Sequence, residues 1–240
     1  MRVLVIIPAY NEEEAIIDVV DNLKKSNDMV DYVIINDCST DNTESILKQE
    51  KFNYISLPVN LGIGGGVQTG YRYAVENNYD IALQMDGDGQ HDPEYIKNII
   101  QPIVDGKADM VIGSRFIEKN GFQSSGLRRV GIKFLSGLIK LCCGTKVLDV
   151  TSGFRATGKQ MTAFFANNYA EDYPEPEAII AATLNGFKVK EVAVLMHERQ
   201  GGESSINAVR SIYYMIKVSL AIIIYRLGNL RKEGGKNNGK

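Results

Sequence analysis

The stretch Ile81-Ala-Leu-Gln-Met-Asp-Gly-Asp-Gly-Gln90 decides both the fold and the chemistry of this sequence. Its first half, residues 81–85, is short and apolar, which is typical of a buried β-strand. Directly after that strand come two carboxylates, Asp86 and Asp88, one residue apart. Asp and Gly also form plain turns, but carboxylates at a strand end suit a hard cation such as Mg²⁺ or Mn²⁺. We therefore expect a metal site here.

Outward from this stretch, strand-like segments alternate with helix-like ones through the first half of the chain. Such alternation predicts right-handed crossovers and an α/β fold, with a mostly parallel sheet covered by helices on both faces. The expected strands are 3–7, 32–35, 54–57, 81–85 and 110–112, and the expected helices are 12–25, 43–49, a stretch from the glycines to about 77, and 93–104.

The second half has a different pattern. We expect a basic amphipathic helix at 127–141, a helix at 174–184, a strand at 187–195 and a long helix at 205–227 that is rich in Ile and Tyr. The last residues are polar and contain glycine, which is typical of a disordered tail. The expected organisation is a main domain at 1–204, an apolar helix at 205–228 and a disordered polar tail at 229–240.

The composition is that of an ordinary globular protein, with 44% hydrophobic and 23% charged residues among 240. A net charge of -2 disfavours nucleic-acid binding, for which a basic surface is typical. Cys38, Cys142 and Cys143 form neither a disulfide framework nor a zinc motif, which indicates reduced thiols in a cytosolic setting. The apolar run before Pro8 is too short for a secretory signal peptide, so we expect the fold to begin there.

Two further segments follow predicted strands, at the sheet edge where ligands bind. Asp37 is placed where its carboxylate could accept hydrogen bonds from a base or a ribose, while residues 39–41 would cap the next helix. Residues 60–66 carry glycines that suit either close approach of a nucleotide or tight helix packing. They match neither the GxGxxG nor the P-loop pattern, which disfavours nicotinamide enzymes and ATPases.

Another segment, residues 199–204, precedes the last predicted helix. Arg199 offers a planar fork of donors to phosphate oxygens, and Ser204 adds a hydroxyl. Taken alone, such a segment is more often a surface loop.

Taken in order, these segments resemble the family 2 glycosyltransferases, which have the GT-A fold, a Rossmann-like and mostly parallel sheet flanked by helices. Ile7-Pro-Ala-Tyr-Asn-Glu12 is similar to the opening strand and turn of that family. Residues 36–41 are similar to its DDGSxD segment, with Asn36 in place of the first Asp, and Asp86-x-Asp88 to its metal motif. The resemblance spans roughly residues 1–206 and makes 1–204 a GT-A catalytic domain.

Within the family, the sequence most resembles polyprenyl-phosphate sugar synthases of the dolichol-phosphate-mannose type. The motifs are DGDGQHDP at 86–93, GSRF at 113–116, DVTSGFR at 149–155 and RxxGxS at 199–204. The resemblance implies a metal site that holds Mg²⁺ or Mn²⁺ and is formed by Asp86, Asp88 and Gln90. The phosphate ligands are expected to be Arg115, Arg199 and Ser204. The nucleotide site is expected to comprise Pro8, Tyr10, Glu12, Asp37, Gly62, Gly64 and Asp86.

The implied reaction is a single inverting displacement, in which the metal and the arginines stabilise charge on the leaving nucleoside diphosphate. A hydroxyl acceptor would need a carboxylate base, whereas a lipid monophosphate is already largely ionised near neutral pH. The candidate acids and bases are Asp149, Glu175 and Glu177, and none is singled out. The expected catalytic set is Asp88, Asp149, Glu177 and Arg115.

The expected function is transfer of a sugar, with UDP-glucose or UDP-GlcNAc as donor, to polyprenyl phosphate at the cytoplasmic face of the membrane. Residues 211–227 are apolar but shorter than the roughly 20 residues of a clean span. An interfacial helix, or one docked on a small membrane partner protein, fits this length, and basic residues in 127–141 suit anionic headgroups. The alternative is a helix buried in the domain core or in a homo-oligomer.

Three other functions remain open. A sugar-to-sugar transferase in surface polysaccharide synthesis, such as a rhamnosyl- or glucosyltransferase, would need an identifiable base. A nucleotidyltransferase would carry a glycine-rich turn after the first strand, where residues 8–11 stand instead. A non-catalytic sugar-nucleotide-binding subunit is disfavoured because the metal motif and Arg199 are all present.

Overall fold

The computed structural model describes residues 1–27, 29–118, 121–123, 125–198 and 208–237. These residues form a seven-stranded sheet in the order β3-β2-β1-β4-β6-β5-β7. Every strand pair is parallel except those of β6, which runs antiparallel to β4 and β5. The strands are β1 Val3–Ala9, β2 Asp31–Asn36, β3 Tyr54–Ser56, β4 Ile81–Gln84, β5 Met110–Ser114, β6 Arg155–Gly158 and β7 Val189–Ala193.

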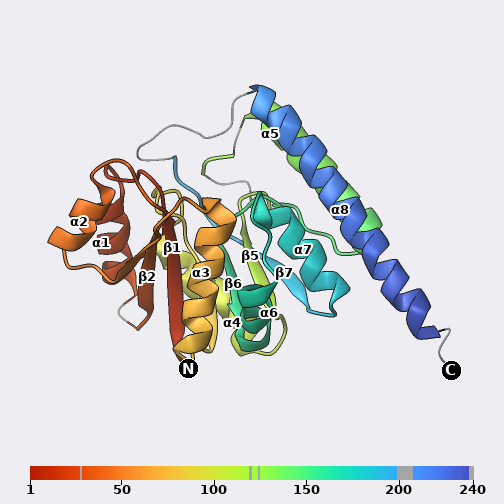
Figure 1. Cartoon of the computed structure of the whole chain (residues 1–240), viewed down its shortest axis with the longest axis horizontal. Helices are drawn as coiled ribbons and strands as arrows, with labels where there is room; N and C mark the ends of the chain where they lie inside the picture. The colour runs from red at the N-terminus through yellow and green to blue at the C-terminus, as the bar shows by residue number, and fades with distance from the viewer. Residues whose placement is uncertain (28, 119–120, 124, 199–207, 238–240) are drawn as a thin grey trace.

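Helices cover both faces of this sheet (Figure 1). One face packs against α1, α2 and α4, and the other against α3, α6 and α7. The long helices α5 and α8 pack on each other and on α7, at the side of the molecule. The helices are α1 Ile16–Ser26, α2 Thr43–Gln49, α3 Gly62–Glu76, the 3₁₀ turn η1 Pro93–Tyr95, α4 Ile96–Val104, α5 Gly126–Cys143, α6 Lys159–Asn167, α7 Pro174–Leu184 and α8 Ala208–Asn237. The predicted α/β class is confirmed.

The pattern of apolar residues explains these elements. All seven residues of β1 are buried, because helices lie on both faces of the sheet and no side of the strand meets water. In α1 the buried residues Ile16, Val19, Val20 and Leu23 recur at intervals of three and four, so one side of the helix packs on the sheet.

Two elements were not predicted from the sequence. The strand β6 contains Arg155, two small residues and a glycine, and it shows no alternation of apolar and polar residues. It is a strand because β4 and β5 pair with it on both sides. The helix α6 follows it directly, with Met161 and Phe165 buried in the core.

The end of the chain differs from the prediction. The helix α8 extends to Asn237, past the predicted end at 227 and into the stretch from 229 that was expected as a disordered tail. Arg, Lys and Glu favour helix, and a helix already formed adds one hydrogen bond for each further residue. The predicted start of this helix at 205 lies outside the described residues. None of the helices within the described residues is long and apolar enough to cross a membrane.

The strands β1, β2, β4 and β5 point the same way, so their carboxyl ends meet at one edge of the sheet, the upper edge in Figure 1. Backbone hydrogen bonds join the loops there: Asp37 N donates to Ala9 O at 2.9 Å and Gly87 N donates to Pro8 O at 3.3 Å. The segments that carry the predicted chemistry therefore begin side by side.

Candidate active site

Asp86 follows β4 at this edge, and its carboxylate is held from the side of the strand. Gln84 Nε2 donates to Asp86 Oδ1 at 2.9 Å. The backbone N of Asp86 donates to His91 Nδ1 at 3.0 Å, and the His91 ring stacks on Phe154 at a centroid distance of 4.8 Å. The Asp86 side chain keeps 32% of its surface exposed. It is thus fixed in place and still open to a ligand.

Asp88 and Gln90 belong to the same turn. Asp88 is buried, and its Oδ1 accepts a hydrogen bond from Gln90 N at 3.0 Å. Gln90 Nε2 donates to His197 O at 3.3 Å, and His197 N donates to Gln90 O at 2.9 Å. These bonds tie the turn to the segment that follows β7.

The donor set of this turn fits a hard divalent cation, because carboxylate and amide oxygens are the ligands that Mg²⁺ and Mn²⁺ take. The described residues contain no cluster of three or more His, Cys, Asp or Glu side chains that could hold a metal. In phosphate-transfer sites Mg²⁺ commonly takes only one or two carboxylates from the protein and completes its ligands with phosphate oxygens and water.

Asp37 lies at the end of β2 and organises the neighbouring loop. It is buried, its Oδ1 accepts a hydrogen bond from Leu61 N at 2.7 Å, and its backbone O accepts one from Asn60 Nδ2 at 3.1 Å. One carboxylate oxygen therefore positions the start of α3. A role in binding a base or ribose would fall to the other oxygen and stays a prediction.

Three other predicted nucleotide residues lie near the end of β1, which is bonded to Asp37 through Ala9 O. Pro8 is buried in β1, and the Tyr10 side chain just after it is 46% exposed. Glu12 is buried, and its backbone N donates to Thr43 Oγ1 at 2.9 Å. The structure thus brings these residues to the edge where β1 and β2 end.

The glycines at the start of α3 have a structural explanation. Gly62 has a φ of +73°, a conformation that favours glycine. A Cβ on Gly64 would lie 2.1 Å from Ala170 O and 2.2 Å from Glu171 O. Of the two interpretations that the sequence leaves open, close packing therefore applies to Gly64, which lies against the backbone of the loop at 170–171. A nucleotide contact at Gly62 or Gly64 stays a prediction.

Arg115 and Asp149 form a buried, two-point ion pair. Arg115 Nε donates to Asp149 Oδ2 at 2.6 Å and Arg115 Nη2 donates to Asp149 Oδ1 at 3.1 Å, and both residues are buried. Glu191 on β7 in turn accepts hydrogen bonds from the backbone N of Leu148 and of Asp149, at 2.7 and 2.8 Å. Burial raises the pKa of Glu191, and these two bonds oppose the rise.

This geometry bears on the predicted catalytic role of Asp149. Both of its carboxylate oxygens accept hydrogen bonds from Arg115, and its side chain is fully buried. Such a carboxylate is suited to holding the guanidinium in place. Its use as a base is therefore disfavoured.

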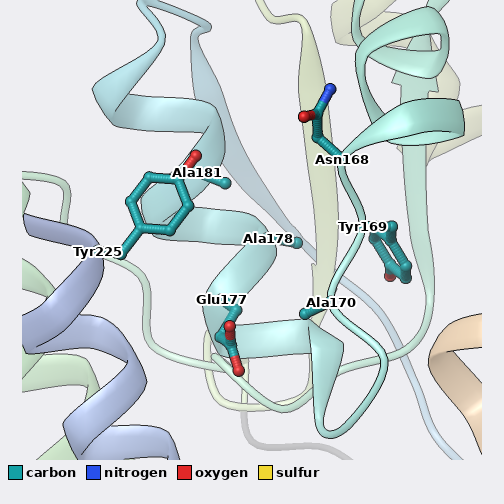
Figure 2. A pocket seen from close by; sticks show the side chains of 7 residues that line it. All are labelled: Asn168, Tyr169, Ala170, Glu177, Ala178, Ala181 and Tyr225. Atoms are coloured by element: carbon teal, nitrogen blue, oxygen red, sulfur yellow. The ribbon is translucent and has the colours of Figure 1, made fainter. Parts of the chain in front are cut away.

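The remaining candidate acids lie on α7 in two different surroundings. Burial raises the pKa of Glu175, and the nearby Arg155 guanidinium opposes that rise while Asp86 adds to it. Glu177 instead borders a cavity of about 280 Å³ between α7 and α8, closed on a third side by the loop at 168–170. Figure 2 shows the Tyr225 ring reaching from α8 towards α7, with Glu177 at the lower end of the cavity. Of the two, Glu175 is thus the one whose pKa the Asp86 carboxylate helps to raise.

Four residues near Asp86 were not singled out from the sequence: Gln84, His91, Gly153 and Arg155. Gln84 could have been noticed as the one polar residue of the otherwise apolar strand β4. His91, Gly153 and Arg155 belong to quoted motifs, but no local pattern tells that Gly153 lies against Asp86 or that Arg155 bonds to the backbone on either side of it. Arg199 and Ser204, predicted to bind phosphates, lie outside the described residues.

Comparisons with known proteins identify the family of this chain. A family model described as Glycosyl transferase family 2 matches residues 4–163. The UDP-N-acetylglucosamine–dolichyl-phosphate N-acetylglucosaminyltransferase of Methanococcus voltae is 34% identical over 212 residues, which cover 80% of this chain and 84% of that protein. The polyprenol monophosphomannose synthase of Mycolicibacterium smegmatis is 26% identical over 231 residues, 91% of this chain and 86% of that protein.

Solved structures support the fold. Glucosyl-3-phosphoglycerate synthase from Mycobacterium tuberculosis, in complex with Mn²⁺, UDP-glucose and phosphoglyceric acid, superposes with a TM-score of 0.71 over 95% of this chain and 80% of that one. The two sequences are 20% identical, so this likeness concerns the fold alone. The matched region runs from β1 into α6 and contains the carboxylate turn, and on that ground the chain belongs to glycosyl transferase family 2 and is a glycosyltransferase.

Proposed function

We propose that this protein transfers a sugar from a nucleotide diphosphate sugar to a polyprenyl phosphate, by inversion at the anomeric carbon. The observation that carries the proposal is the carboxylate turn at residues 86–90, located at the same sheet edge as Asp37 and the buried Arg115. Relatives that match over most of their length are named for transfer to dolichyl or polyprenol phosphates, which supports the acceptor class.

The roles of the residues follow from where charge develops. Asp86, Asp88 and Gln90 would hold Mg²⁺ or Mn²⁺, which supplies positive charge to the leaving diphosphate. Asp149 holds the Arg115 guanidinium rigidly, so no reorganisation is needed when negative charge builds on a phosphate nearby. Arg199 and Ser204 are proposed as further phosphate ligands.

The surroundings of the carboxyl groups favour a phosphate acceptor over a sugar hydroxyl. Asp149 is engaged by Arg115, and Glu177 lies in the cavity between α7 and α8. Burial raises the pKa of Glu175, which leaves it as the one candidate base among the three. A lipid monophosphate is largely ionised near neutral pH and can attack without a carboxylate base.

The donor is proposed to be UDP-N-acetylglucosamine, with UDP-glucose as the second choice. Support comes from the name of the Methanococcus voltae relative, which specifies UDP-N-acetylglucosamine.

We further propose that the protein acts at the cytoplasmic face of a membrane as a peripheral protein. Large apolar side chains are exposed on both outer helices, including Phe134 at 56% on α5 and Ile224 at 65% on α8. Basic residues of α5, among them Arg129, Lys133 and Lys140, are also exposed. Apolar and basic side chains on one helix suit an anionic lipid surface.

The experiment is incubation of the purified protein with radiolabelled nucleotide sugars and polyprenyl phosphate, with and without Mn²⁺. We expect label in the organic-soluble lipid fraction, strongest with a UDP-sugar, and no transfer in excess EDTA. Asp86→Asn keeps the size of the side chain and removes its charge, and it should lower the transfer rate by roughly 10²–10³-fold, as loss of one charge-stabilising group does elsewhere.

Three other outcomes of the transfer assay would contradict parts of the proposal. Label found only in an oligosaccharide would replace the proposal with the sugar-to-sugar alternative. Undiminished transfer in EDTA would overturn the metal assignment. Binding of the nucleotide sugar without turnover on any acceptor would support the non-catalytic subunit.

A further inference from the structure

Neighbouring groups restrain the two oxygens of the Asp86 carboxylate unequally. Its Oδ1 accepts a hydrogen bond from Gln84 Nε2 at 2.9 Å. Its Oδ2 accepts no hydrogen bond from the part of the chain that the structure describes, and the nearest ring nitrogen, His91 Nε2, is 3.9 Å away. One oxygen is thus restrained while the other remains available.

Gln84 is an unusual residue for its position. It lies in a strand whose residues are all buried, and it is itself fully buried. Its Oε1 has no hydrogen-bond partner among the described residues, although leaving a buried acceptor unsatisfied costs stability. A fully buried amide with one unsatisfied oxygen is therefore better explained by its bond to Asp86 than by packing.

Gly153, in the loop that leads into β6, lies against the same carboxylate. A Cβ at this position would lie 2.6 Å from Asp86 Oδ2, 2.9 Å from Asp86 Oδ1 and 2.9 Å from Gln84 Nε2. All three distances are shorter than a carbon atom tolerates. The backbone at Gly153 therefore limits where the Asp86 side chain can turn.

Arg155 anchors the segment that carries Gly153. This arginine is fully buried, and its guanidinium donates twice to the backbone O of Ser152, including Nε at 3.0 Å. Its Nη1 donates to the backbone O of Glu175 at 3.0 Å, at the start of α7. Arg155 also pairs with Gln84 in the β4–β6 register, so the anchor and the amide lie on neighbouring strands at the same level.

From this arrangement we propose that Gln84, Gly153 and Arg155 are positioning residues that fix the Asp86 carboxylate for a divalent cation. This inference rests on the proposed function, since it assigns supporting groups to the same site. Gln84 holds Oδ1, Gly153 blocks rotation of the side chain, and Arg155 keeps the Gly153 backbone in contact. Groups that orient a metal ligand typically change metal affinity or activity by 10- to 100-fold when lost.

The first test uses Gln84→Leu. Leucine is apolar and of similar size, and it removes the unsatisfied oxygen, so the variant should fold at least as well as the parent. Its matched control is Gln101→Leu, because Gln101 Nε2 donates to Asp105 Oδ1 at 2.7 Å in an exposed pair on α4, away from the site. Binding of Mn²⁺ is measured by loss of the free-ion signal in electron paramagnetic resonance, without and with UDP.

We expect Gln84→Leu to weaken Mn²⁺ binding by roughly ten-fold or more, and Gln101→Leu to leave it unchanged. In transfer assays, the Mn²⁺ concentration for half-maximal rate should rise by a similar factor. A parent-like Mn²⁺ affinity in Gln84→Leu would overturn the inference while leaving the proposed function intact. Absence of Mn²⁺ binding and of transfer in the parent protein would overturn both.

The second test uses Gly153→Ala, with Gly137→Ala as its control. Neither glycine has a positive φ, and a Cβ on Gly137 would meet no atom of the described part of the chain within 4 Å. We expect only Gly153→Ala to weaken Mn²⁺ binding, with the melting temperature by circular dichroism checked for both. Equal Mn²⁺ affinities in the two variants would contradict the role of Gly153.

The third test compares Arg155→Lys with Arg155→Met. Lysine keeps the charge and can donate to only part of the carbonyl set, so Mn²⁺ affinity should rank parent, then lysine, then methionine. If the methionine variant does not fold, Gln84→Leu and Gly153→Ala decide the inference. Folded Arg155 variants with parent Mn²⁺ affinity would remove Arg155 from the proposal.

Discussion

Residues 144–155, which run from the end of α5 to the first residue of β6, and the pair of outer helices α5 and α8 depart from ordinary burial in opposite directions. In the first region charged side chains are buried. Asp149 is fully buried and accepts hydrogen bonds from Arg115, and Arg155 is fully buried and donates to the backbone O of Ser152. In the second, large apolar side chains are outside, with Leu127 at 79% and Leu141 at 84% exposure on α5 alone.

The difference separates a region that fixes the geometry of its side chains from a region that offers a surface for binding. Buried polar groups are costly unless every partner is in place, so they specify one geometry. Exposed apolar groups leave the fold free to form and become favourable when another apolar surface covers them. The first region suits a site that must hold phosphates in fixed positions, and the second suits a lipid surface.

The largest expected effect is a loss of stability when the buried Arg115–Asp149 ion pair is broken. Asp149→Ala leaves the Arg115 guanidinium buried without its carboxylate, which typically costs about 3–5 kcal/mol in the free energy of unfolding. Urea denaturation measures this cost. Transfer should also fall, because Arg115 loses its fixed position.

The matched control is Asp172→Ala, which breaks the exposed ion pair with Lys217 of α8. Exposed ion pairs contribute about 0–1 kcal/mol to the free energy of unfolding, so the urea midpoint of this variant should move little. Equal losses in the two variants would mean that burial of the Arg115–Asp149 pair contributes nothing special.

A smaller effect is expected for the exposed apolar residues of α5 and α8. Ile224→Glu places a charge on the apolar surface of α8. Full burial of an isoleucine side chain in an apolar environment stabilises the bound state by about 1.5–3 kcal/mol, and the variant loses this contribution. Binding to vesicles that contain phosphatidylglycerol should fall roughly ten-fold, as measured by sedimentation, while the melting temperature stays near that of the parent. Phe134→Glu on α5 should act in the same way.

Val75→Glu serves as the control, because Val75 is 42% exposed on α3 and lies on another part of the surface. It should bind vesicles like the parent. Vesicle binding that survives both Ile224→Glu and Phe134→Glu would contradict membrane docking through these helices, and a shift in oligomeric state would instead assign the surface to a second copy.

The smallest effect concerns α7, which lies between the two regions. Burial raises the pKa of Glu177, while Lys217 opposes the rise. The folded protein therefore holds this proton more tightly than the unfolded chain, and the charged carboxylate reduces stability as pH rises through the folded pKa. Glu177→Gln should raise the melting temperature slightly at pH 8 and less at pH 4.

The same variant tests the predicted catalytic role of Glu177. Because Glu177 borders the cavity between α7 and α8, we expect the transfer rate of Glu177→Gln to stay within about two-fold of the parent, since loss of a general base typically costs 10²-fold or more. A rate loss of that larger size, with the fold intact, would restore Glu177 as a catalytic residue.

Much of the fold could be predicted from the sequence because the signals are local. The expected helices 43–49 and 174–184 match the structure residue for residue, and the expected strand at 3–7 differs from β1 only at its end. The strand-end position of Asp86 and Asp88 was also predictable, since parallel strands present their carboxyl ends at one edge.

The sequence by itself determined the α/β class, the sheet edge and the carboxylate turn, because apolar periodicity and motif spacing act over a few residues. Only the tertiary structure decided that β6 enters the sheet antiparallel, that Asp149 is committed to Arg115, and that Gly153 faces Asp86. These features join residues far apart in the chain. Their energies come from burial and pairing with particular partners, which no local pattern encodes.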